Sequence, residues 1–297
     1  MINIHVPFFG ELVSILNSNV VELNTIEIEK LYTDWCKGFM DNKSILTDKR
    51  SKLLLRDTQN VPSQSCLNGI DFPTWFGGFH QKKVVILGID PLRNETEFKK
   101  ANADIRNDLI IGTPYAFHLK GFREKRTSAY WQVISEVSAS NFVYVTDIYK
   151  TFFYTGNSNE VRSYDYWNKS GNDSLNNNHR KILIDELNLI DPDLIVTFGA
   201  LAYRVLTNQK YCPKLSQPLS EIIKKIQHFT DPGILSAKPI KVLPLMHLSG
   251  STRSEPLDNF FKANGIPYSD KIDKRNKAGH LYGKLINDYL INEPKTR

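Results

Sequence analysis

The stretch VVILGIDP (residues 84–91) is the most informative part of this chain, because an apolar run ends there in a glycine, an acidic residue and a proline. A second stretch, VLPLMHLSGS (residues 242–251), has the same form and places His247 after an apolar run. In an open parallel α/β sheet, ligands bind in the crevice outside the carboxyl ends of the strands. The two stretches therefore predict that Asp90 and His247 share one cleft, although 157 residues separate them.

Each of these residues has an ordinary structural role as an alternative. Asp90 has the position of an aspartate that caps the following turn, and His247 that of a histidine satisfied by neighbouring backbone groups. The functional interpretation gives Asp90 the task of orienting water or stabilising a developing cation. The run Ser249-Gly250-Ser251 combines small hydroxyl side chains with a glycine, which suits close approach to a phosphate.

The apolar pattern predicts the fold class. Four β-branched runs predict strands at residues 84–88, 142–146, 194–198 and 241–246. Helical spacing predicts helices at residues 129–139, 179–190, 199–206 and 254 to about 264. Strands that alternate with helices in this way indicate a parallel sheet covered on both faces. We therefore predict an α/β fold, with three α/β/α layers around a central four-stranded parallel sheet.

The first quarter of the chain has a different character. Residues 1–75 lack an obvious series of strands, and residues 26–40 place Ile28, Leu31 and Trp35 at helical spacing. We predict a mainly helical N-terminal extension at residues 1–75, packed on an α/β domain at residues 76–297. The Asn- and Ser-rich stretch at residues 156–178 predicts a loop.

Composition restricts the class of protein. The three cysteines, Cys36, Cys66 and Cys212, form no C-x-x-C pair, which favours reduced thiols over a disulfide framework or a cysteine-built zinc site. No apolar run approaches the roughly 18 residues that span a bilayer. Residues 1–11 lack the basic flank of a secretory signal. We expect a cytoplasmic protein that has no contact with membranes.

The positive charge is unevenly distributed. The net charge is +6, and residues 1–80 carry 7 Lys/Arg against 9 Asp/Glu, so the remaining chain carries an excess of +8. Two basic groups stand out: Lys120, Arg123, Lys125 and Arg126, and Lys271, Lys274, Arg275 and Lys277. Such groups attract phosphate backbones, although a run of charges is more often a solvated face.

Five motifs in chain order resemble those of the uracil-DNA glycosylase superfamily, over about residues 82–265. The first is Gly88-Ile89-Asp90-Pro91-Leu92, where the family has G-Q-D-P-Y, G-M-N-P or G-I-N-P. The others are Gly112-Thr113-Pro114-Tyr115 for G-x-P-F, YVTDIYK (residues 144–150) for Y-I-T-N-x-x-K, VTFGALA (residues 196–202) for the third strand with its glycine and helix, and His247-Leu248-Ser249-Gly250 for H-P-S-P or H-P-S-G. Each motif is weak alone, but five in the expected order are specific.

The resemblance implies a glycosylase-like fold and a role for each matched residue. Members of this family flip a nucleotide out of DNA and cleave its N-glycosidic bond, which leaves the sugar cation-like and the base anionic. Asp90 is expected to position water and stabilise the sugar, and His247 to hydrogen-bond a base oxygen. Tyr115 is expected to stack on the base, with Phe117 as the alternative ring. The implied base-binding residues are Ile89, Leu92, Tyr115, Phe117 and Asp147, and the implied DNA contacts are Ser249, Gly250, Ser251, Arg253 and Lys150.

Three residues depart from the family pattern. Asp147 replaces the asparagine that reads the uracil edge, and an ionised aspartate only accepts hydrogen bonds. It can take the N3–H of uracil but repels O4 unless burial keeps it protonated. Leu92 replaces the aromatic residue that shields the base C5 position in the strictest branch, and Leu248 replaces the usual proline. A surface or capping carboxylate is the structural alternative for Asp147.

The sequence therefore leaves three functional hypotheses. The first is a monofunctional DNA glycosylase that excises uracil or a related damaged base, works as a monomer on single- or double-stranded DNA and needs no cofactor or metal. The second is a weak or inactive relative that binds nucleic acid or a nucleobase. The third is a hydrolase of a small nucleoside or nucleotide.

Overall fold

The computed structural model consists of two compact units, each assembled from several segments of the chain. The first unit comprises Met1–Thr74, Gly88–Gly121 and Val145–Ile190, and the second Trp75–Leu87, Phe122–Tyr144 and Asp191–Arg297. The predicted division into residues 1–75 and 76–297 stays a prediction. The structure describes residues 3–21, 23–37, 44–46, 65–89, 109–123, 128–155, 160–161, 177–208, 218, 221, 239–248, 254–269 and 271–292.

The second unit is built on a mostly parallel sheet. Its strand order is β10 (Val242–Leu245), β9 (Leu194–Phe198), β4 (Lys83–Gly88), β6 (Phe142–Asp147) and β3 (Thr74–Phe76). The neighbours β4, β9 and β10 are parallel. All four runs predicted as strands therefore form strands of one sheet, and β3 is a fifth strand that was not predicted. The mixed α/β class is confirmed, whereas the three-layer arrangement stays a prediction.

These segments form strands because they bury both faces. Every residue of β6 and β9 is buried, and such near-continuous apolar runs are typical of parallel strands covered on both sides. The glycine after β9, Gly199, has a φ of +96° and donates its N–H to the Leu245 carbonyl at 2.8 Å. Only glycine adopts that backbone conformation readily, so Gly199 turns the chain into the following helix.

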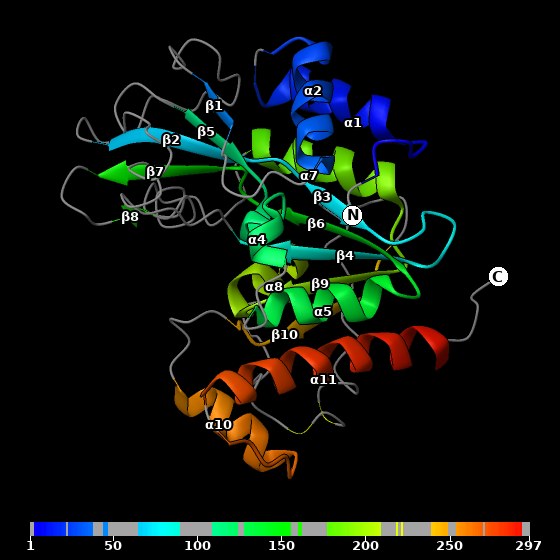
Figure 1. Ribbon diagram of the computed structural model, residues 1–297, viewed down its shortest axis with the longest axis vertical. Helices are drawn as coiled ribbons and strands as arrows, with labels where there is room; N and C mark the ends of the chain where they lie inside the picture. Colours follow the sequence, from blue (N-terminus) through cyan, green and yellow to red (C-terminus); the bar gives the residue numbers. More distant parts are fainter. Residues whose placement is uncertain are drawn as a thin grey trace. The chain divides into compact units, whose positions relative to one another are not determined.

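Three described helices of the second unit follow the prediction closely: α5 (Ala129–Ser138), α8 (Ala200–Thr207) and α10 (Ser254–Ala263). A further helix, α11, spans Lys271–Asn292. Helix α11, which was not predicted, runs alongside α5 (Figure 1). The two helices approach closely at Gly279, where an added Cβ atom would lie 2.6 Å from the Ala129 carbonyl oxygen. Helix α10 packs on α11 through Phe260 and Tyr282, whose ring centroids are 5.6 Å apart.

The first unit contains a second sheet that the sequence did not predict. Its strand order is β1 (Ser44–Leu46), β5 (Leu109–Gly112), β2 (Ser65–Asp71), β7 (Thr151–Thr155) and β8 (Glu160–Val161). Strand β2 is parallel to β5, and the other pairs are antiparallel. Strand β2 reads SCLNGID, with a register shift between Leu67 and Gly69. Its Ser, Asn and Gly residues have low strand propensity, so the apolar pattern did not predict this strand.

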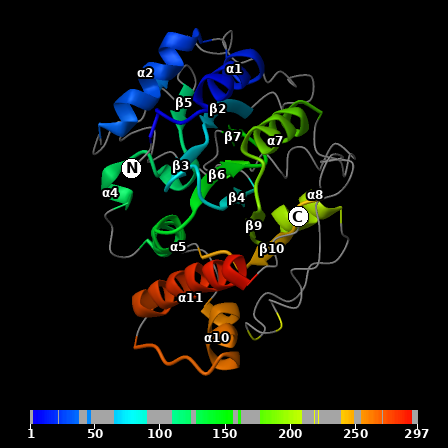
Figure 2. The ribbon, with the colours of Figure 1, turned by 90° about the vertical axis from the view of Figure 1, so that its right-hand side faces the viewer.

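Among its described residues, the first unit contains the helices α1 (Phe9–Asn19), α2 (Thr25–Cys36) and α7 (Asn177–Ile190) and the short η1 (Pro114–Ala116). The short helix α4 spans Lys120–Arg123. Helices α1 and α7 lie side by side (Figure 2). Helix α2 begins at a capping box, in which Asn24 and Glu27 exchange two hydrogen bonds of 2.8 Å. The predicted amphipathic helix is thus present, with its start fixed by local hydrogen bonding.

Candidate active site

The sequence-predicted site residues fall into two groups. Asp90, Leu92, Ser249, Gly250, Ser251 and Arg253 lie outside the described residues. Ile89, Tyr115, Phe117, Asp147 and Lys150 belong to the first unit, and His247 belongs to the second. The predicted meeting of Asp90 with His247 therefore stays a prediction.

Asp147 and Gly88 are in direct contact within the first unit. Asp147 is the last residue of β6 and is 4% exposed. A Cβ atom on Gly88 would overlap the Oδ1 atom of Asp147 and would lie 3.6 Å from the Tyr115 hydroxyl oxygen. With Asp147 in this conformation only glycine fits at position 88, because the carboxylate occupies the place of a Cβ atom. This arrangement brings three of the five motifs together.

Tyr115 occupies an unusual backbone conformation. The turn from Thr113 to Ala116 is closed by a 2.9 Å hydrogen bond from the Ala116 N–H to the Thr113 carbonyl. Tyr115 has a φ of +56° and Ala116 a φ of +55°, in the left-handed region that residues with a side chain seldom occupy. Such outliers cluster at binding and catalytic sites. The side chain of Tyr115 is half-buried, so its ring remains partly open to solvent.

Phe117 has different surroundings. It is 1% exposed, and its ring centroid lies 5.4 Å from that of Tyr115. A fully buried ring supports its neighbours and offers no free face to a base. Between the two aromatic candidates, the structure therefore leaves Tyr115 as the ring with accessible surface.

The N-terminal helices support the loop that carries Tyr115. The His118 ring nitrogen Nδ1 lies 3.1 Å from the Thr113 hydroxyl, which also accepts the His118 N–H at 3.0 Å. The ring of Trp35, on α2, lies 5.1 Å from the His118 ring. Helix α2 is anchored in turn by Tyr32, whose hydroxyl donates to the Pro73 carbonyl at 2.9 Å. Burial, with the Glu186 carboxylate as a second cause, raises the pKa of Tyr32 well above its usual value.

The chain after Asp147 stays paired with the end of β4. The Ile148 N–H donates to the Gly88 carbonyl at 3.1 Å, and the Tyr149 N–H donates to the Ile89 carbonyl at 2.9 Å. These bonds extend the ladder by two residues beyond the strand. They hold Ile89, which is directly bonded to Asp90 in the chain, at a defined distance from the Asp147 segment.

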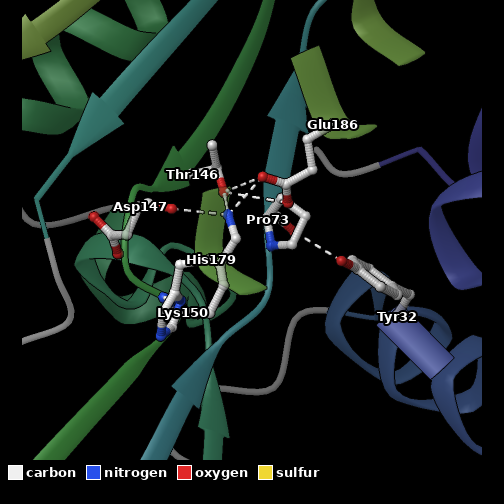
Figure 3. Close-up of polar contacts among 7 residues, drawn as sticks. All are labelled: Tyr32, Pro73, Thr146, Asp147, Lys150, His179 and Glu186. Carbon is white, nitrogen blue, oxygen red and sulfur yellow. Dashed lines mark hydrogen bonds and ion pairs between the residues drawn. The ribbon is translucent and has the colours of Figure 1, made fainter. Parts of the chain in front are cut away.

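Lys150 is not placed as a DNA contact. Its side chain is completely buried, and its ammonium group lies 2.5 Å from the Glu186 carboxylate of α7, which is also completely buried (Figure 3). The ammonium group also donates to the Thr146 hydroxyl and, at 2.8 Å, to the Asp147 carbonyl. An ammonium group has three donors, and these three acceptors use all of them. A phosphate contact needs an accessible cation, so we correct that prediction.

His179 completes the surroundings of Lys150. Its Nδ1 atom accepts the Lys150 N–H at 3.3 Å. Burial, with the nearby Lys150 charge as a second cause, lowers the pKa of His179 to about 3. The imidazole is therefore neutral at neutral pH, and it acts here as a hydrogen-bond acceptor.

His247 follows β10 in the second unit and is held by Tyr130 of α5. The ring centroids of Tyr130 and His247 are 5.5 Å apart in an edge-on arrangement. The Tyr130 hydroxyl accepts the N–H of the next residue, Leu248, at 2.8 Å. Tyr130 also packs against Phe198 at the end of β9, with ring centroids 5.0 Å apart. One tyrosine thus fixes both the ring and the backbone at His247.

Two lysines of the second basic group are paired with carboxylates. Lys274 is buried and forms an ion pair with Asp258 of α10, and Lys277 lies 3.0 Å from Asp273 within α11. Burial makes Lys274 a poor candidate for a phosphate contact. Over the described ranges, the side chains of His, Cys, Asp and Glu form no group of three or more suited to a metal ion. No helix among those residues is both long and apolar enough to cross a membrane.

The comparison with protein families agrees with the motifs. The model of the uracil DNA glycosylase superfamily matches residues 75–265. This range contains all five motifs and more than half of the chain, so the chain belongs to the uracil-DNA glycosylase superfamily. Members of this superfamily act on DNA and hydrolyse N-glycosidic bonds. A search of curated proteins gave no match.

Several residues around the site were not found from the sequence. Tyr130 lies 118 positions from its partner Leu248, and Glu186 lies 36 positions from Lys150. Trp35 was assigned to a helix without any link to the Tyr115 loop. Only Glu186 carried a signal, since an acidic residue on the apolar face of a helix is unusual. The others pair through contacts that no local pattern encodes.

Proposed function

We propose that this protein is a monofunctional DNA glycosylase that hydrolyses the N-glycosidic bond of uracil or of a related damaged base flipped out of DNA. Membership of the superfamily supports the reaction type. The observation that carries the proposal to this chain is the contact of Asp147 with Gly88 beside the Tyr115 hydroxyl. A pocket for a flipped base needs a polar group that hydrogen-bonds the edge of the base and an aromatic ring that stacks on its face. Asp147 and the half-buried Tyr115 supply such groups next to the first motif.

The proposed base pocket divides the work between two side chains. The ring of Tyr115 stacks on the face of the extruded base, and the Asp147 carboxylate accepts a hydrogen bond from its edge. Gly88 keeps the floor of the pocket clear, since any side chain there meets the Asp147 carboxylate. Ile89 and Leu92 border the same space in the family arrangement.

The proposed chemistry takes place at the other side of the base. Asp90 positions a water molecule at C1′ and stabilises the positive charge that develops on the sugar as the bond to the base breaks. His247 donates a hydrogen bond to the base oxygen on which negative charge accumulates. The water oxygen forms the new bond to C1′ and gives up a proton to the Asp90 carboxylate, while the base leaves with the bonding electron pair and takes up a proton from solvent. Ser249, Gly250, Ser251 and Arg253 contact DNA phosphates and the gap left in the stack.

A second candidate is a relative that binds nucleic acid or a nucleobase without efficient catalysis. Asp147 favours it, because the family asparagine both donates and accepts, whereas an ionised carboxylate repels the O4 atom of uracil. In that case, the pocket is retained and base excision is lost. The two candidates differ in one observable, the formation of abasic sites.

A panel of oligonucleotides separates the two candidates. Single- and double-stranded substrates that carry uracil, hydroxymethyluracil or hypoxanthine are incubated with the protein and then cleaved with alkali at abasic sites. The proposed glycosylase produces scission with at least one of these bases. Binding of the same oligonucleotides without scission supports the second candidate and excludes the first.

Replacing Asp147 by asparagine is expected to increase uracil excision at neutral pH by about fivefold, because a carboxylate facing O4 becomes an amide donor and one gained hydrogen bond is worth about 1 kcal/mol. The single-turnover rate on a uracil oligonucleotide measures the change. Asp191→Asn, an exposed aspartate at the end of α7, is the control and should leave the rate unchanged. A slower rate for Asp147→Asn would show that the carboxylate itself serves uracil recognition.

Replacing Tyr130 by phenylalanine is expected to lower the single-turnover excision rate by about tenfold, because the Leu248 N–H loses its acceptor and the backbone next to His247 loses its tether. The affinity for DNA and the melting temperature should change little, since the ring contacts with Phe198 and His247 remain. Stopped excision reactions and a DNA titration measure the two quantities. An equal loss in affinity and rate would argue against a positioning role for the Tyr130 hydroxyl.

A further inference from the structure

The buried ion pair between Lys150 and Glu186 is an expensive feature that the proposed chemistry does not use. Two charges removed from water are tolerated only when their geometry is good and further hydrogen bonds satisfy them. Both side chains are completely buried, and their charged atoms lie 2.5 Å apart. Replacing such a pair by apolar residues of similar volume is often neutral or stabilising. The pair is therefore weak evidence for added stability, and its hydrogen bonds show what it holds in place.

The contacts of the pair converge on the backbone at Asp147. The Lys150 ammonium group donates to the Asp147 carbonyl at 2.8 Å and to the Thr146 hydroxyl. That hydroxyl lies 3.2 Å from Glu186 Oε2 and closes a triangle of hydrogen bonds. In Figure 3, the Asp147 carboxylate points away from the Lys150 ammonium group, which is bound instead to the main-chain oxygen. The lysine thus fixes the turn that aims the carboxylate and leaves the carboxylate itself unoccupied by the ammonium group.

The same turn is tied to the first motif. Its next two residues, Ile148 and Tyr149, donate their N–H groups to Gly88 and Ile89. The residue that follows Ile89 is Asp90. A shift of the turn would therefore move the base-reading carboxylate and the backbone that leads to Asp90 together.

We propose that the Lys150–Glu186 pair, with Thr146, is a positioning clamp that sets the base-reading carboxylate of Asp147 and the end of β4 in one fixed arrangement. The proposal rests on the function proposed above for Asp147 and Asp90. It assigns Lys150, Glu186 and Thr146 as positioning residues that do not touch the substrate. Small displacements of groups around a reacting centre are costly, since a misplacement of about 1 Å can reduce a rate about 100-fold.

The test uses a variant that removes both charges together. Lys150→Met/Glu186→Gln keeps the side-chain lengths and avoids leaving a single buried charge. The matched control is Lys181→Met/Asp185→Asn, which removes an exposed ion pair of 2.6 Å from the same helix, α7. Thr146→Val is a milder variant that leaves the ion pair in place and removes only the hydroxyl. It tests the same hydrogen bonds if the double variant does not fold.

Amide hydrogen exchange measures how firmly the clamp holds the backbone, and it does so independently of any enzymatic activity. We expect the Ile148 and Tyr149 amides to exchange at least tenfold faster in Lys150→Met/Glu186→Gln than in the wild type, and severalfold faster in Thr146→Val. The Ile195 amide, which bonds to the Lys241 carbonyl in the second unit, should keep its rate, and the control variant should change none of the three. Equal acceleration of all three amides, or no acceleration at Ile148 and Tyr149, would overturn the proposal.

Base excision provides the functional readout. The clamp variant is expected to lose at least tenfold in the single-turnover rate while its affinity for undamaged DNA stays within twofold, because both side chains of the pair are completely buried and cannot contact a phosphate. Unchanged excision in a variant with altered exchange would overturn the positioning role. If the wild type excises none of the tested bases, the proposed function fails, and the exchange rates still decide whether the clamp exists.

Discussion

Replacing Asp90 by asparagine is expected to slow base excision by about 10²–10⁴-fold, the usual range for a group that handles the proton of an attacking water. Asparagine keeps the shape of the side chain but removes the charge that orients the water and stabilises the developing sugar cation. Affinity for DNA should rise or stay constant, because a negative charge near the phosphates is removed. Single-turnover kinetics with excess enzyme on the best substrate of the panel measure the rate directly.

The control for this prediction is an aspartate of the same chemistry elsewhere on the first unit. Asp34 lies on α2, and its carboxylate is 3.9 Å from Lys37 at the surface. Asp34→Asn should leave excision and folding unchanged, since exposed ion pairs contribute little. A rate for Asp90→Asn within threefold of the wild type would remove Asp90 from the mechanism.

Replacing Gly88 by alanine is expected to reduce excision by about 100-fold, because a displacement of a catalytic or recognition group by about 1 Å has an effect of that size. Little loss of stability is expected. The added methyl group occupies the position of the Asp147 Oδ1 atom and approaches the Tyr115 hydroxyl. The carboxylate is the far end of a side chain, so it can rotate away without moving the backbone. Excision rate and melting temperature together separate these two effects.

Gly10 provides the matched glycine. It lies in α1, and no atom is within 4 Å of the position that its Cβ would take. Gly10→Ala should retain full excision and gain slightly in stability, because alanine favours a helix. If Gly88→Ala kept wild-type excision, the contact between Gly88 and Asp147 would have no part in the base pocket.

The strands that carry the motifs were predictable because they are buried on both faces. The run VVIL of β4, which starts at Val84, and the run LIVTF of β9 are buried at every residue. A continuous apolar run of this kind is typical of a strand in a parallel sheet. The second sheet was not predictable by the same means. Strand β2 contains serine, asparagine and glycine, and it gains its place through pairing with β5 and β7 rather than through its own propensity.

The candidate site shows the same division. Gly88, Tyr115 and Asp147 were singled out from short motifs, and the structure brings these three residues together within the first unit. The surroundings of Lys150 were not predicted, because a lysine at a strand end is normally exposed and its partner Glu186 lies on a distant helix. Tyr130 gave no signal, since an aromatic residue in a helix is usually core. Long-range pairing decides the role of both residues, and local patterns do not contain it.

The central claim, hydrolysis of an N-glycosidic bond in DNA, is tested most directly by mass spectrometry of the reaction products. The wild type and Asp90→Asn are incubated with a single oligonucleotide that contains one uracil or related base. We expect the wild type, and not the variant, to form an intact strand that carries one abasic site, together with the released free base. A substrate of unchanged mass across the whole panel, or strand cleavage without release of a free base, would contradict it.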